Sequence, residues 1–187
     1  CGYGEIFKHS LIADKKFFLF LNKNKSKILN LQSPFIENAI HKSCFIKKKV
    51  IELDEKESSL RKILNFGHTF AHAFESTLNY SKKLNHGEAV ILGIKMASKF
   101  SLTNKLLNNT EFKLIDNHIN KLNLKISINS LFTKNDINKI LSFMTKDKKN
   151  ITKKINLILL KKIGYPSYGF QFTKEKIRSF LSKELIK

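Results

Sequence analysis

The sequence is poor in cysteine and proline and lacks tryptophan: its 187 residues include two Cys, two Pro and no Trp. Cys1 and Cys44 alone cannot build a disulfide scaffold, and so few cysteines suit a reducing compartment. No run of ~18 apolar residues occurs, which excludes a membrane-spanning helix. The hydrophobic content of 42% is enough to bury a core, so wholesale disorder is also excluded.

The 187-residue sequence also shows no initiating Met and no leader-like segment. It begins with Cys1, and no basic segment followed by an apolar segment precedes it. The length suits one domain, or one domain with an appendage. We therefore expect the chain to be a processed form or a fragment of a longer protein.

Acidic residues are scarce, because 15 Asp and Glu face 35 Lys and Arg and leave a net charge of +20. Only Arg61 and Arg178 are arginines, whereas Lys, Asn, Ile and Phe, which share A/T-rich codons, are abundant. Proteins that recognise nucleic-acid bases and phosphates favour Arg, because its planar guanidinium can form two parallel hydrogen bonds. We interpret the charge mainly as a solvated lysine background and expect no nucleic-acid partner. Aromatic residues are not segregated opposite a lysine face, so we expect no membrane partner either.

The apolar periodicity predicts a mainly α-helical domain with a small β element near the C-terminus. Helices are expected over residues 3–22 with a break at Asp14, 34–53, 57–78 with a bend at Gly67, 87–101, 110–122 and 133–145. The remaining residues, 146–187, are expected to form a loop, a β-hairpin and a last helix. In the hairpin, Ile155–Leu160 and Tyr168–Phe172 would flank a turn at Gly164-Tyr165-Pro166.

Residues suited to chemistry concentrate in the middle of the chain. On one helix, Glu57, Arg61, Asn65, His68 and His72 would form a single stripe where apolar residues or exposed lysines are usual. Two histidines four residues apart can reach one metal or one substrate. The alternative is a solvated face with incidental histidines.

A third histidine, His86, stands where a buried apolar helix is expected to begin. With His68 and one carboxylate it would make a catalytic metal site with open positions; a capping or surface role is the alternative. Glu5 is the attractive carboxylate, and Lys8 follows on the same face. The other histidines are interpreted as surface or packing residues: His9, His41 and His118.

Together these motifs resemble 3-dehydroquinate synthase, and the resemblance covers nearly the whole chain. It rests on Gly2–Lys8, Lys47, Asp54–Glu57 with Arg61, Leu64–Phe70 with His72 and Glu75, His86–Val90, and Asp147–Lys149 followed by Ile155–Leu160. The opening motif is similar to the start of the family's C-terminal domain. The resemblance implies that residues 1–187 form this C-terminal domain, helical over 1–145. The family's N-terminal nucleotide-binding domain is missing, because no strand–Gly-rich turn–helix unit occurs.

The resemblance also implies a reaction and its site. The family is a phosphate-eliminating carbon–oxygen lyase that converts 3-deoxy-D-arabino-heptulosonate 7-phosphate into 3-dehydroquinate, in the shikimate route to chorismate and the aromatic amino acids. It uses Zn²⁺ or Co²⁺ and a catalytic NAD. The implied metal ligands are Glu5, His68 and His86. The implied substrate-site residues are Lys8, Lys47, Glu57, Arg61, Asn65, His72 and Lys148, with Lys149 an alternative to Lys148. No NAD-binding residue is assigned to this chain.

Since the family draws further active-site groups from the missing domain, we expect the isolated chain to be inactive. The resemblance implies a cytoplasmic enzyme that is a homodimer at full length. Gly4 and Ala71 stand where related chains often have Ala and Gly, and minor packing changes are expected there. The alternatives are a related sugar-phosphate cyclase, a metal-dependent polyol dehydrogenase, or a basic helical nucleic-acid-binding module. The Lys and Arg set favours a phosphorylated acid over a simple polyol.

Overall fold

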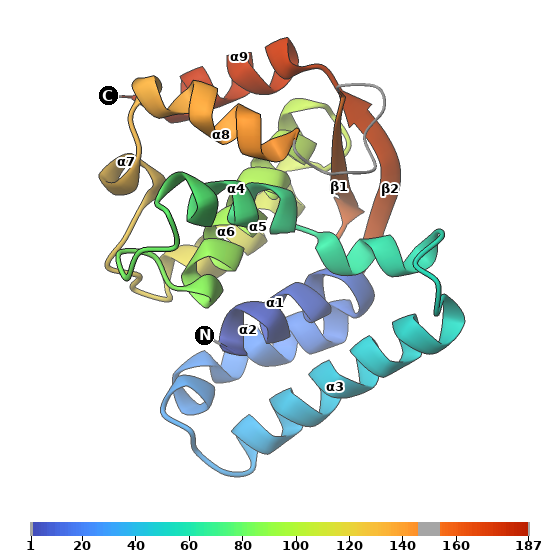
Figure 1. Cartoon of the computed structure of the whole chain (residues 1–187). Coiled ribbons are helices and arrows are strands. Elements are labelled where there is room, and N and C mark those ends of the chain that lie inside the picture. The colour runs from blue at the N-terminus through green and yellow to red at the C-terminus, as the bar shows by residue number, and fades with distance from the viewer. Residues whose placement is uncertain (1, 146–153, 187) are drawn as a thin grey trace.

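The structure, a computed structural model, describes residues 2–145 and 154–186. Figure 1 shows two groups of helices, one above the other, with a β-hairpin along one edge. The elements are α1 (Gly2–Ala13), α2 (Lys15–Leu29), α3 (Phe35–Leu53), α4 (His68–Thr77), α5 (His86–Thr103), α6 (Asn109–Asn120), α7 (Ile128–Leu131), α8 (Ile137–Met144), β1 (Ile155–Lys162), β2 (Tyr165–Phe172) and α9 (Lys174–Glu184). Short 3₁₀ helices span Leu60–Asn65 and Lys134–Asp136. The mainly α architecture with a hairpin near the C-terminus confirms the prediction.

The helix α5 is the centre of the upper group and contacts α1, α4, α6 and β1. It is buried over most of its surface, with Lys95 and Lys99 on a partly exposed stripe, and a helix of this kind is stable only when other elements cover its apolar faces. Asn85 and Glu88 form a reciprocal capping box that fixes its first turn. His86, the first residue of α5, therefore has a well-defined backbone position. Neither α5 nor any other helix in the described ranges is long and apolar enough to cross a membrane.

The helices α1, α2 and α3 contact one another and form the lower group in Figure 1. Asp14 separates the first two, because its carboxylate accepts hydrogen bonds from the backbone N–H groups of Lys16 and Phe17 at 2.8 and 3.1 Å. This confirms the expected break. Ile6 of α1 belongs to the core of the lower group, while the adjacent Phe7 belongs to the main core. The helix α1 therefore joins the two groups.

The hairpin is antiparallel, and its turn contacts the helices. The turn lies at Ile163 and Gly164, slightly earlier than predicted, so Pro166 is already part of β2. Gly164 has a φ of +86°, a conformation that suits glycine. Its N–H donates to the carbonyl of Leu11 at 2.7 Å, and that of Ile163 donates to the carboxylate of Glu111 at 2.8 Å. These bonds fix the turn against α1 and α6.

The prediction of one helix over 57–78 is wrong. A 3₁₀ helix occupies Leu60–Asn65, and α4 begins only at His68. Between them Gly67 has a φ of +81°, which interrupts the helical path. Gly67 therefore makes the expected bend, and the stripe of five polar residues is divided among a loop (Glu57), the 3₁₀ helix (Arg61, Asn65) and α4 (His68, His72).

Candidate functional site

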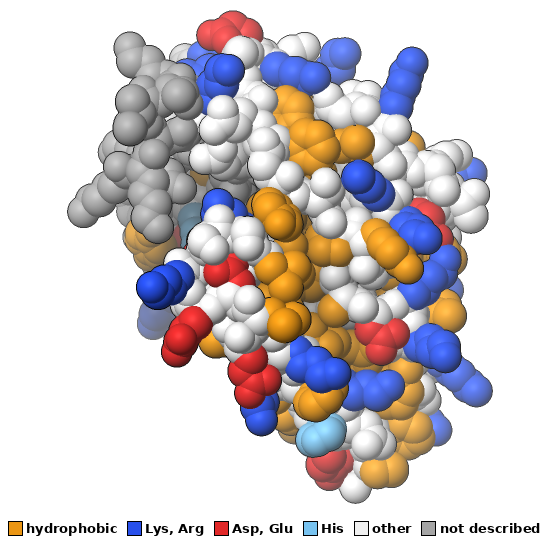
Figure 2. Space-filling view, turned by 90° about the vertical axis from the view of Figure 1, so that its right-hand side faces the viewer, with side chains coloured by type: hydrophobic (Ala, Val, Ile, Leu, Met, Phe, Trp, Pro, Cys, Tyr) orange, Lys and Arg blue, Asp and Glu red, His pale blue; other side chains and the backbone are white. Residues whose placement is uncertain are grey.

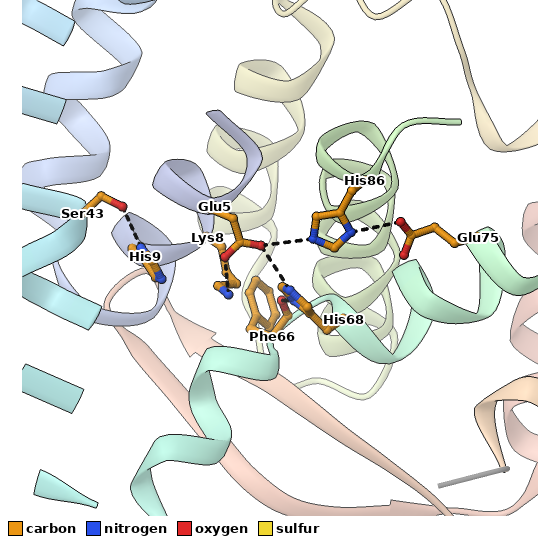
Figure 3. A network of polar contacts seen from close by, with 8 residues as sticks. All are labelled: Glu5, Lys8, His9, Ser43, Phe66, His68, Glu75 and His86. Carbon is orange, nitrogen blue, oxygen red and sulfur yellow. Dashed lines mark hydrogen bonds and ion pairs between the residues drawn. The ribbon is translucent and has the colours of Figure 1, made fainter. Parts of the chain in front are cut away.

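Three side chains from the starts of three helices meet at one point (Figure 3). Glu5 lies in the first turn of α1, His68 begins α4 and His86 begins α5. Glu5 Oε1 is 3.1 Å from His68 Nε2 and 3.8 Å from His86 Nε2. One ligand atom from each residue lies within 4.8 Å of the others. The structure thus brings together the three residues that the sequence nominates as metal ligands.

Glycines at two helix crossings allow this convergence. A Cβ atom on Gly4 would lie 2.7 Å from the carbonyl oxygen of Gly87, so α1 approaches α5 as closely as it does only because Gly4 has no side chain. A Cβ atom on Gly93 would lie 2.2 Å from the carbonyl oxygen of Gly67 at the crossing of α4 and α5. Gly4 is therefore more than the minor packing change that was expected. These two crossings bring together the first turns of α1, α4 and α5, which bear the three converging side chains.

The carboxylate of Glu5 is suited to bind a cation, because it is charged and one of its oxygens accepts no hydrogen bond within the described part of the chain. Although His68 Nε2 is near, the buried Oε1 accepts no hydrogen bond from the residues that the structure describes. Burial alone raises the pKa of Glu5, but the nearby His68 and Lys8 outweigh it and hold this pKa below its ordinary value. A charged oxygen facing two imidazole nitrogens fits Zn²⁺ or Co²⁺ and leaves further coordination positions open.

A buried ammonium lies beside this carboxylate. Lys8 Nζ donates to Glu5 Oε2 at 2.7 Å, and the residue is only 3% exposed. Burial lowers the pKa of Lys8, and the ion pair with Glu5 opposes that effect. Lys47 of α3 is close enough for its charge to lower the pKa of Lys8 further. The site therefore combines one carboxylate with two neighbouring cationic side chains.

The histidines form a cluster of rings. The ring of His72, one turn after His68 on α4, lies edge-on to that of His68, with centroids 5.3 Å apart. It also stacks on the ring of His86 at 6.3 Å. His72 is exposed and lies beside the three converging residues without being one of them.

Glu75 is a member of the site to which the sequence assigns no role. Its Oε1 lies 3.0 Å from His86 Nδ1, on the opposite side of the ring from Glu5 (Figure 3). Glu75 follows His68 by seven residues, which is two helical turns, so both project from the same side of α4. That spacing is the signal that could have identified it.

The remaining predicted residues of this region lie in and after the loop that follows α3. The carboxylate of Asp54 organises the loop by accepting hydrogen bonds from the backbone N–H groups of Ser58, Ser59 and Arg61 at 3.0, 2.8 and 2.9 Å. These bonds hold the pKa of Asp54 below its ordinary range. The backbone position of Arg61 is thus set by a residue to which the sequence assigns no specific role.

The 3₁₀ helix is bonded to this loop: Asn65 Nδ2 donates to Glu57 Oε1 at 2.9 Å, and Arg61 Nη1 donates to the carbonyl of Glu55 at 2.8 Å. Glu57 has a φ of +54°, a strained conformation of the kind that clusters at functional sites. Among the described residues, no hydrogen bond or ion pair links Glu57, Arg61 or Asn65 to the three converging side chains. Lys148 lies outside the described residues.

The histidines without a predicted role divide into two kinds. His9 and His118 are buried as packing residues, whereas His41 is exposed on α3. His118 is hydrogen-bonded to Tyr3 and Asn22, at 2.8 and 3.1 Å, and therefore connects α1, α2 and α6.

The many lysines do not gather into one patch on the face that Figure 2 shows, where Lys and Arg side chains alternate with apolar and acidic ones. Several lysines of the described surface have partners. Lys95 and Lys99 pair with Asp116 and Glu184 at 2.9 and 2.7 Å. Lys49 lies over the ring of Phe45, 4.5 Å from its centroid. On the face shown, the lysines are therefore dispersed among other side chains.

Residues 2–150 match the family described as 3-dehydroquinate synthase C-terminal. A 3-dehydroquinate synthase of Pelagibacter ubique (strain HTCC1062) is 67% identical over 100% of this chain and 51% of its own length. Another, from Thermodesulfovibrio yellowstonii, is 35% identical over 97% of this chain and 50% of its own length. The chain thus spans about half the length of the curated relatives it matches.

Two solved structures have a similar fold. One is a 2-epi-5-epi-valiolone synthase from Streptomyces hygroscopicus subsp. jinggangensis 5008 with NAD⁺ and Zn²⁺ bound; the TM-score is 0.82 at 20% identity, over 97% of this chain and 49% of that one. The other is a 2-deoxy-scyllo-inosose synthase complexed with carbaglucose-6-phosphate, NAD⁺ and Co²⁺; the TM-score is 0.68 at 21% identity, over 97% and 50%. At these identities the likeness concerns the fold.

Proposed function

This chain belongs to the 3-dehydroquinate synthase C-terminal family, and on that premise we propose that it is the metal- and substrate-binding half of a 3-dehydroquinate synthase. The complete enzyme would convert 3-deoxy-D-arabino-heptulosonate 7-phosphate into 3-dehydroquinate and phosphate, as a carbon–oxygen lyase of the shikimate pathway. The convergence of Glu5, His68 and His86 carries the proposal, because these three side chains could together hold a metal ion and all lie within the matched residues 2–150.

Glu5, His68 and His86 would hold Zn²⁺ or Co²⁺. When bound, the ion supplies a Lewis acid that polarises a substrate hydroxyl and lowers its pKa. Lys8 neutralises the second oxygen of Glu5 and keeps a cation at the edge of the site. His72, exposed beside His68, is placed to orient the substrate or to carry a proton.

The substrate carries a carboxylate and a phosphate, so its site needs cations at both ends. The guanidinium of Arg61 suits a bidentate grip on a carboxylate, and Lys8, Lys47 and Lys148 suit phosphate as point charges. Asn65 would add a hydrogen bond, and Glu57 holds the amide of Asn65 in place. The Arg61 bond to Glu55 leaves other guanidinium N–H groups free to donate.

NAD would be bound by the half of the enzyme that this chain does not include. The relatives' lengths support this division, since the chain spans only about half of each. The family resemblance extends the proposal to a cytoplasmic homodimer at full length, and to an isolated chain without activity.

A chimaera tests the function directly. This chain replaces the matched 51% of the Pelagibacter ubique relative, and phosphate release and 3-dehydroquinate formation are measured with NAD and Zn²⁺ or Co²⁺. We expect turnover by the chimaera, none by the isolated chain, and none by the His68→Ala chimaera. The control His41→Ala changes an exposed histidine of α3 and should retain activity. A folded, metal-loaded chimaera that releases no phosphate would refute the proposal.

The same chimaera separates the rival functions. A related cyclase would prefer a sugar phosphate that lacks the carboxylate, and a polyol dehydrogenase would accept an unphosphorylated polyol. A nucleic-acid-binding module would bind DNA or RNA with an affinity that falls steeply with salt and is indifferent to His68→Ala.

A further inference from the structure

One proposed metal ligand is far less enclosed than the others. The side chain of His86 is 49% exposed, compared with 13% for His68 and 33% for Glu5. The packing around α5 fixes the backbone of His86, but a half-exposed imidazole can rotate about its side-chain bonds. Something other than burial must therefore hold the ring in the orientation that the site requires.

Glu75 supplies that contact. Its side chain is 9% exposed, and its Oε1 lies 3.0 Å from His86 Nδ1. Figure 3 shows the ring of His86 between the two carboxylates, with Glu75 on one side and Glu5 on the other. Since Glu75 lies on α4 and His86 on α5, the contact also links the two helices that carry the histidine ligands.

The contact with Glu75 determines which ring nitrogen of His86 has a lone pair that can bind a cation. A neutral imidazole has one N–H donor and one lone pair, and a carboxylate can only accept. The proton therefore resides on Nδ1, facing Glu75, and the lone pair resides on Nε2. Nε2 is the atom that faces Glu5 Oε1 at 3.8 Å. With the opposite tautomer, Nε2 would present a hydrogen to the site and could not bind a cation.

We propose that Glu75 is a positioning residue for the metal site: it fixes the tautomer and the orientation of His86 so that Nε2 is presented to the ion. The proposal rests on the proposed metal role of Glu5, His68 and His86. Carboxylates that bind the outer nitrogen of a ligating histidine typically contribute 10–100-fold in metal affinity.

The experiment measures the affinity of the 187-residue chain for Zn²⁺ and Co²⁺ by competition with a chromophoric chelator. Glu75→Ala is expected to raise Kd about 10–100-fold. Glu75→Gln should raise it less, because an amide oxygen can accept the same hydrogen bond without the charge. His86→Ala should lose at least as much as Glu75→Ala. The double variant should match His86→Ala alone, because Glu75 acts through His86.

Glu111 offers a matched control, since its side chain is also 9% exposed and also holds two elements together. Glu111→Gln should lower the melting temperature without changing Kd. The visible absorption of bound Co²⁺ adds a readout of ligand geometry that a general loss of stability would not alter. We expect a changed spectrum for Glu75→Ala and an unchanged one for Glu111→Gln.

Three outcomes would overturn the proposal. The first is a wild-type Kd in both Glu75 variants, and the second is a double variant in which the two losses add. The third is a wild-type chain that binds neither ion, which would also remove the metal role from the proposed function. Failure of the first two kinds leaves the proposed function standing, because activity of the chimaera tests that function separately.

Discussion

His9 of α1 and Ser43 of α3 form a buried hydrogen bond, with His9 Nδ1 2.7 Å from Ser43 Oγ (Figure 3). The other ring nitrogen, Nε2, is buried and has no hydrogen-bond partner within the described part of the chain. Lys47 lies one helical turn after Ser43, so this bond helps to set the position of α3 beside the site. The His9–Ser43 bond, inside the lower group of helices, thereby helps to position Lys47 at the site.

Ser43→Ala should lower the free energy of unfolding by about 1–3 kcal/mol, because both ring nitrogens of a buried His9 would then lack a partner. Urea unfolding of the 187-residue chain measures the change. Cys44→Ala is the matched control, since Cys44 is exposed at the next position of α3. Its effect should stay within about 0.5 kcal/mol. Equal losses in the two variants would contradict a specific role for the His9–Ser43 bond.

His118 should make stability depend on pH. Burial lowers its pKa to about 4 from an ordinary value of 6.5, so the unfolded chain binds a proton that the folded chain rejects. The stability is therefore complete above pH 6.5 and is lost as the pH falls towards 4. Between pH 7.5 and 5 the loss due to His118 should be about 2 kcal/mol.

Urea unfolding at the two pH values tests this in His118→Phe, which keeps a ring against Phe7. The variant will be less stable at both values, since Tyr3 and Asn22 lose a partner, but its difference between them should shrink by about 2 kcal/mol. His41→Phe, at an exposed position, should retain the full difference. An undiminished pH dependence in His118→Phe would rule out His118 as its source.

Elements defined by local signals were predictable from the sequence. The strongly apolar character of α5 and the carboxylate of Asp14 between α1 and α2 each specify a structure within a few residues. The bend at Gly67 was also predictable, because glycine is the residue that adopts a positive φ without strain. The consequence of this bend was not predicted. Periodicity placed Arg61 and His68 on one helix, whereas the positive φ of Gly67 separates the 3₁₀ helix of Arg61 from α4, which begins at His68.

Relationships across helices were not predictable in the same way. The meeting of Glu5 with His68 and His86 depends on the spacing at the Gly4–Gly87 crossing, and no local pattern specifies which helices will cross. The sequence nominated Glu5 as the attractive carboxylate, and the family resemblance implied it as a ligand, but neither predicted the packing that brings it to the two histidines. The spacing from His68 could have placed Glu75 on the site side of α4, but its partnership with His86 depends on the packing of α4 on α5, which no local pattern specifies.

Gly93→Ala should disturb the crossing of α4 and α5. The new Cβ would lie 2.2 Å from the carbonyl oxygen of Gly67 and 3.0 Å from the backbone nitrogen of Ala71, so α4 must move away. Overpacking of this kind costs about 1–3 kcal/mol, and more where the clash is with backbone. Thermal unfolding measures the loss. The control Gly2→Ala places its Cβ where no atom lies within 4 Å, and it should leave the melting temperature nearly unchanged.

Zinc should stabilise the chain through the three converging residues. An ion that binds only the folded state adds about 2.7 kcal/mol when its free concentration is 100 times Kd. In a chain of this size that corresponds to a rise of roughly 5–10 °C in the melting temperature. His68→Ala should abolish the rise, because one of two imidazole ligands is lost, whereas His41→Ala should preserve it. Stabilisation that survives in His68→Ala would place the ion elsewhere, since Glu5 and His86 alone leave an exposed site with too few ligands to hold it.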